Sequence, residues 1–141
     1  MNIGDLGFAA SLGLAAFGSA LGAMSAGAAA IGGWKKCFAQ NRAAPFMLIA
    51  FVGAPLTQTI YGMILMNAIR ASGVSSIAKL GAGLFGGLAL GGSAWFQGVA
   101  GAHASDAMAE TGKGFGNFIM VLGLVETTAI FTMVFMMGAI G

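Results

Sequence analysis

Charged residues divide the chain into four long apolar runs, residues 6–34, 43–69, 80–105 and 114–141. Each run exceeds the about 20 apolar residues that a helix needs to cross a hydrocarbon core about 30 Å thick. A segment in lipid must also satisfy its own backbone hydrogen bonds, which favours helix. The pattern therefore predicts an all-α membrane protein with four transmembrane helices.

Three short polar segments join the runs: residues 35–42, 70–79 and 106–113. The first and third together carry more Lys and Arg than the second, so the positive-inside tendency favours cytoplasmic first and third connections. The first run is too long for the apolar part of a signal peptide, and we expect it to remain as a helix. The predicted location is the cell membrane, with several passes through the bilayer.

Composition agrees with lipid as the main solvent. Of the 141 residues, 58% are hydrophobic and only 7% are charged, whereas an ordinary soluble domain is about one quarter charged. The six Lys and Arg are scattered and form no dense basic patch, so we expect no nucleic-acid partner. The single cysteine, Cys37, permits no intrachain disulfide and no cysteine metal site.

The two halves of the chain resemble one hairpin written twice. Ser19-Ala20 and Gly27-Ala28 in the first run recur as Ser93-Ala94 and Gly101-Ala102 in the third. Residues 57–60 can likewise be aligned with residues 125–128, which places Gln58 where Glu126 stands. We therefore predict two tandem transmembrane hairpins, residues 1–72 and residues 73–141, with function at the interface of the repeats.

Glycine is concentrated in the first and third runs, in stripes such as Gly18-x3-Gly22 and Gly83-x3-Gly87-x3-Gly91, whereas Met and Phe favour the second and fourth runs. Small residues let helix backbones approach closely in lipid. We expect the first and third helices to be crowded together and the second and fourth to lie outside. A tight inner circle of helices fits this pattern, and the alternative is that glycine only packs the two hairpins of a monomer.

Glu126 is the one acidic residue inside an apolar run. An acidic side chain at mid-membrane costs about 2.5 to 3.5 kcal/mol on insertion scales, and such residues are functional by default. The other runs contain no Lys or Arg, and His103 lies near the end of its run. We therefore expect a proton or a cation, and no intrachain ion pair, to neutralise Glu126. The alternative is a protonated glutamic acid with a purely structural role.

Oxygen-bearing groups gather on one face of the second predicted helix. Ala54, Thr57, Gln58 and Tyr61 follow the i, i+3, i+4, i+7 spacing of a single helix face. Pro55 lies within this stripe and removes one backbone hydrogen bond, which frees a carbonyl oxygen in the preceding turn. The face can therefore present hydroxyl, amide and carbonyl oxygens together.

The third predicted helix adds one strongly polar central residue, Gln97. With Glu126, Thr57 and Gln58 it would complete an all-oxygen shell, which hard cations prefer. A proton would need far fewer oxygens, so the set indicates a dehydrated monovalent ion such as sodium. The alternative is that the amides only hydrogen-bond between helices.

These segments resemble a known family. The two-hairpin layout, Pro55-Leu56-Thr57-Gln58 with Tyr61-Gly62, Gln97-Gly98, and Leu124-Val125-Glu126-Thr127 are similar to the proteolipid rotor subunit (K or c) of V-type ATPases, closest to the bacterial sodium-translocating branch. The resemblance implies a rotor ring of identical four-helix subunits that turns against a stator subunit with a basic residue and joins the central-stalk subunits. One departure is Leu56, where a smaller residue is expected.

The resemblance also implies residue roles. Glu126 would be the ion carboxylate, Gln97, Thr57 and Gln58 would be side-chain ligands, and Ala54 would supply a backbone carbonyl. Tyr61 would hold the carboxylate closed by a hydrogen bond. The subunit would carry Na⁺, or alternatively H⁺, and would be no enzyme on its own, since ATP turnover belongs to the whole rotary complex.

Two other functions stay open from the sequence. The first is a proton-translocating V-type rotor subunit. The second is a small four-helix, proton-coupled exporter, for which we would expect an aromatic-rich cavity and the carboxyl group in an early helix. The size of the assembly distinguishes a ring from such an exporter.

Overall fold

The computed structural model describes residues 2–141, and this part of the chain is helical without any strand. The helices are α1 (Ile3–Ala39), α2 (Leu48–Gly53), α3 (Thr57–Ala71), α4 (Ser76–Thr111) and α5 (Phe115–Ile140), with a 3₁₀ turn, η1 (Ala54–Leu56), between α2 and α3. Taken as one unit, Leu48–Ala71 joins α1, α4 and α5 as four helices long and apolar enough to cross a membrane. The predicted all-α fold with four such helices is confirmed.

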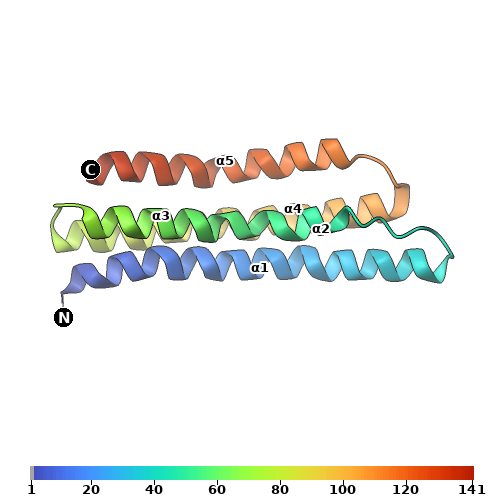
Figure 1. Cartoon of the computed structure of the whole chain (residues 1–141), viewed down its shortest axis with the longest axis horizontal. Helices are drawn as coiled ribbons and strands as arrows, with labels where there is room; N and C mark the ends of the chain where they lie inside the picture. The colour runs from blue at the N-terminus through green and yellow to red at the C-terminus, as the bar shows by residue number, and fades with distance from the viewer. Residues whose placement is uncertain (1) are drawn as a thin grey trace.

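The helices form an elongated bundle in which consecutive long helices run in opposite directions (Figure 1). The start of α1 and the end of α5 lie at the same end of the bundle as the α3–α4 connection. The predicted division between residues 72 and 73 falls in that connection. Met1 lies outside the described residues, and the duplication of the two hairpins stays a prediction.

The connections at the other end begin later in the chain than the sequence predicts: residues 40–47 join α1 to α2, and residues 112–114 join α4 to α5. Lys35 and Lys36 belong to α1, and residues 106–111 belong to α4. The reason is helix length: the 37 residues of α1 span about 55 Å at about 1.5 Å per residue. This exceeds a hydrocarbon core about 30 Å thick, so the last turns carry charged side chains outside the lipid without leaving the helix.

Polar contacts join these projecting helix ends. Lys36 forms a salt bridge with Glu110 across α1 and α4, with 3.3 Å between Nζ and Oε1. Arg42, in the α1–α2 connection, donates to the carbonyl oxygens of Ala109 and Glu110 at 3.2 and 3.3 Å. These carbonyls lie in the last turn of α4, where the helix leaves its acceptors without partners. Gly112 ends α4 with a φ of 68°, in the left-handed region that glycine adopts without strain.

Helices α1 and α4 pack backbone against backbone through glycine. A Cβ atom added at Gly18 would overlap the backbone of Gly91, and one added at Gly98 would overlap the backbone of Gly22. The predicted close approach of the first and third helices is confirmed, and its cause is the small-residue stripe. Helix α5 is the most open of the long helices, since only Leu122, Ala129 and Ile140 are buried in it.

Pro55 interrupts the second membrane-spanning helix as predicted. Because proline has no N–H, the α-helical pattern of hydrogen bonds cannot continue through it. The chain forms the 3₁₀ turn η1 at this point and resumes α-helix at Thr57. The interruption lies beside α1, since Pro55 Cβ would be 2.8 Å from a Cβ added at Gly22. It places Ala54 and Thr57 at the junction of two helix segments inside the bundle.

Candidate ion-binding site

Glu126 lies near the middle of α5 and is partly buried against the rest of the bundle. Within residues 2–141, the structure contains one salt bridge, between Lys36 and Glu110 at the end of the bundle. Glu126 forms no salt bridge in this part of the chain. Its charge must therefore be met by hydrogen bonds together with a proton or an ion.

Helix α3 provides two hydroxyl groups to one carboxylate oxygen. Thr57 Oγ1 donates to Glu126 Oε1 at 2.6 Å, and the phenol of Tyr61 donates to the same atom at 2.8 Å. Thr57 is the first residue of α3 and Tyr61 follows one turn later, so both lie on the same helix face. The 3₁₀ turn at Pro55 therefore starts the helix face that meets Glu126.

Further oxygen atoms surround Thr57. Its Oγ1 lies 3.0 Å from the carbonyl oxygen of Ala54 and 3.1 Å from Oε1 of Gln58, in addition to the contact with Glu126. A threonine hydroxyl has one hydrogen and can donate it to one acceptor at a time. The Thr57 hydrogen can therefore bridge only one of these three pairs of oxygen atoms. In the other two pairs, two oxygens lie close together without a hydrogen from Thr57 between them.

The second carboxylate oxygen faces α4. Gln97 Nε2 lies 3.2 Å from Glu126 Oε2 and 3.0 Å from the carbonyl oxygen of Leu122. Gln97 Oε1 accepts from Gln58 Nε2 at 2.9 Å. Gln58 is fully buried and Gln97 is 1% exposed. The two glutamines thus form a buried bridge from α3 to α5 through α4.

All six residues singled out in the sequence meet at one place: Glu126, Gln97, Gln58, Thr57, Ala54 and Tyr61. Gln97 differs in orientation from the expected ligand, since it faces Glu126 with its amide nitrogen. The carbonyl of Leu122 accounts for this, because a carbonyl can only accept a hydrogen bond. The ligand roles themselves stay predictions.

Sequence reasoning missed Ser93 and the carbonyl groups of Leu122 and Val125, which also belong to this network. Ser93 lies one turn before Gln97 on α4 and recurs in the repeat as Ser19, a signal that could have pointed to it. Backbone carbonyls carry no signal in the sequence.

The arrangement is rich in oxygen and poor in hydrogen. Five oxygen atoms, from Ala54, Thr57, Gln58, Tyr61 and Glu126, are linked by contacts of 2.6 to 3.1 Å. Only the two hydroxyl groups bring side-chain hydrogens to these contacts. A hard monovalent cation prefers such oxygen ligands. No group of three or more His, Cys, Asp or Glu gathers in the described residues.

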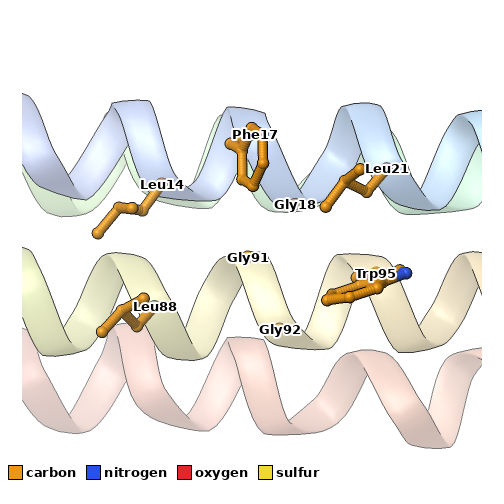
Figure 2. A pocket seen from close by; sticks show the side chains of 8 residues that line it. All are labelled: Leu14, Phe17, Gly18, Leu21, Leu88, Gly91, Gly92 and Trp95. Atoms are coloured by element: carbon orange, nitrogen blue, oxygen red, sulfur yellow. The ribbon is translucent and has the colours of Figure 1, made fainter.

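An apolar groove of about 200 Å³ lies apart from this cluster. Figure 2 shows it between α1 and α4, with Leu14, Phe17 and Leu21 facing Leu88 and Trp95 across the glycine contact. Its lining contains two aromatic residues but does not include Glu126. This groove is therefore separate from the site around Glu126.

Comparison with known families adds one finding. Residues 80–138 match the family model of the ATP synthase C subunit. The match covers most of α4 and α5, including Gln97 and Glu126, and supports a c-type proteolipid of the ATP synthase and V-ATPase kind. The first hairpin lies outside the matched residues. No curated protein matches the chain.

Proposed function

We propose that this protein is an ion-translocating rotor-ring subunit in the membrane sector of a V-type ATPase, carrying Na⁺ on Glu126. Identical copies form the ring, a stator subunit supplies a basic residue, and central-stalk subunits join the ring to the ATP-hydrolysing part. The protein is no enzyme by itself, and it resides in the cell membrane. The family match of the second hairpin supports the ion-carrying proteolipid part of this proposal.

The observation that carries the proposal is the oxygen cluster around Glu126. We assign Glu126, Thr57, Gln58 and the carbonyl of Ala54 as sodium ligands. Gln97 joins them through its amide oxygen in the loaded state, which requires its amide to turn from the orientation described above. Tyr61 keeps the carboxylate against α3 through its hydroxyl at 2.8 Å.

The mechanism follows from charge in lipid. A loaded Glu126 carries little net charge and can pass the lipid-facing part of the ring's rotation. An empty carboxylate is expensive at that depth, so it is held where the stator's basic residue compensates it. Each elementary charge that crosses the whole field contributes about 2.3 kcal/mol per 100 mV. Rotation and ion movement are therefore coupled through one carboxyl group per four helices.

Sodium should protect Glu126 from modification by a hydrophobic carbodiimide at fixed pH. The reagent attacks a carboxyl group that can take up a proton, and a bound cation occupies the same oxygens. We expect the labelling rate of the purified assembly to fall at least about tenfold at saturating sodium, as in a one-site competition. The measurement is the mass of the labelled protein over time in sodium and in matched choline salt.

Equal labelling in sodium and choline would contradict sodium as the cargo. It would favour H⁺, the alternative cargo, since a proton needs only one oxygen of the cluster. Potassium at the same concentration is the matched control for ionic strength, and we expect weaker protection than with sodium.

The assembly should be much larger than a dimer. We expect the protein in mild detergent to have a mass many times that of one chain, because the lipid-facing cost of Glu126 is lowest when neighbouring copies cover it. Native mass spectrometry measures this directly. A stable dimer would contradict the rotor and favour the small exporter.

A further inference from the structure

Ser93 connects the buried glutamine bridge to α5. It lies on α4, is 6% exposed, and donates from Oγ to the carbonyl oxygen of Val125 at 3.1 Å. The same Oγ lies 3.5 Å from Nε2 of Gln58. Because a serine hydroxyl has a single hydrogen, Ser93 can only accept from Gln58 while it donates to Val125.

The amide nitrogen of Gln58 therefore faces two acceptors. One is Oε1 of Gln97 at 2.9 Å, and the other is Oγ of Ser93 at 3.5 Å. An amide nitrogen has two hydrogens, so both find a partner although Gln58 is fully buried. The oxygen end of the same amide is left facing Thr57 Oγ1 at 3.1 Å, within the cluster around Glu126.

The reversed amide would be unfavourable. Turning Gln58 over would place its oxygen against Oε1 of Gln97, whose own amide is held by the carbonyl of Leu122. It would also leave its nitrogen against Thr57, among oxygens that a cation needs. Unpaired or repelling polar groups are costly in a buried site. With Gln97 in the orientation described above, two partners on α4 therefore determine the orientation of Gln58. When Gln97 turns its amide oxygen to the ion in the loaded state, Ser93 is the acceptor that stays with the Gln58 nitrogen.

We propose that Ser93 is a positioning residue that holds the Gln58 amide with its oxygen toward the ion, and so sets the affinity of the site for sodium. This inference rests on the proposed function of the site. The hydrogen bonds of the Ser93 hydroxyl in the described chain are with the Gln58 amide and the Val125 carbonyl, so its effect on the predicted ligands is transmitted through that amide.

The test is the sodium concentration that half-protects Glu126 from carbodiimide. Ser93→Ala removes the acceptor, and Ser93→Cys keeps the shape with a weak one. We expect both to raise the half-protecting concentration about 3- to 10-fold, the value of one hydrogen bond. Ser93→Thr keeps the hydroxyl and should stay within about twofold of the wild type. Labelling without sodium should be alike in all assembled variants.

Two controls separate positioning from packing. Ser105→Ala removes another buried α4 hydroxyl, one without a partner in the described chain, and should leave sodium protection unchanged. In a Gln58→Ala background, adding Ser93→Ala should change the half-protecting concentration less than about twofold, because the amide through which it acts is gone.

Unchanged protection in Ser93→Ala, or an undiminished effect in the Gln58→Ala background, would overturn the role of Ser93 while leaving sodium as the cargo. A wild-type protein that sodium does not protect would overturn the sodium proposal, and this inference with it. The two failures are distinguished by the wild-type measurement alone.

Discussion

Glu126→Gln should abolish sodium binding and sodium-coupled ATP turnover while leaving the oligomer assembled. The amide lacks the negative charge that holds the cation, and its nitrogen would place hydrogens among the oxygens of Thr57 and Tyr61. Two unit charges about 4 Å apart interact by about 4 kcal/mol at an effective dielectric constant of about 20. That corresponds to about a thousandfold in affinity. Sodium binding to the purified oligomer and ATP turnover in the assembled complex are the measurements.

The matched control is Glu110→Gln, which removes an acid from the bundle end. Glu110 is exposed and pairs with Lys36 at 3.3 Å, and such surface pairs contribute little. Sodium binding by this variant should stay within about twofold of the wild type. Normal sodium binding by Glu126→Gln would contradict the assignment of Glu126 as the ion carboxylate.

The sequence predicts those features of the fold that follow from the exclusion of charged residues from the hydrocarbon core. Charge-free runs longer than the hydrocarbon core leave no alternative to helices, and the four predicted helices are present. The predicted ends of the first and third helices were wrong. Charged residues mark where a helix leaves the lipid, whereas its backbone hydrogen bonds continue beyond that point. Lys36 and Glu110 are both helical and meet each other outside the predicted spans.

The sequence predicts the part of the site whose residues lie on one face of a single helix. The spacing of Thr57, Gln58 and Tyr61 puts their polar groups on one face of α3, and the cost of Glu126 in lipid identifies the residue that they meet. The sequence alone does not fix how closely Gln97, Glu126 and Gln58 approach one another. The glycine contacts between α1 and α4 and the turn at Pro55 fix the actual approach.

Amide orientation could not be predicted from the sequence. Gln97 was expected as an oxygen ligand, but the carbonyl of Leu122 attracts its nitrogen to the α5 side. The role of Ser93 could not be predicted either. It depends on which acceptor takes the single hydrogen of the Ser93 hydroxyl, and that acceptor is the carbonyl of Val125. Backbone carbonyl groups determine these orientations. Because every residue has a backbone carbonyl, the residue pattern does not reveal which carbonyls take part.

Gly83→Ala should destabilise the bundle strongly without touching the ion site. A Cβ atom at Gly83 would overlap the backbone of Gly7 on α1, and backbone cannot move aside as the end of a flexible side chain can. Forced separation of packed elements costs about 1 to 3 kcal/mol or more. In lipid this close packing is also the main attraction between helices. We expect a lower denaturant midpoint in mild detergent, followed by loss of the oligomer.

Gly81→Ala is the matched control on the same helix, since nothing lies within 4 Å of a Cβ added there. Alanine is a better helix former than glycine by up to about 1 kcal/mol, so the control should be unchanged or slightly more stable. Midpoints are compared by circular dichroism at equal detergent concentration. Equal stability of the two variants would mean that α1 and α4 do not depend on backbone contact at Gly83, and that the glycine stripe does not hold the two hairpins together there.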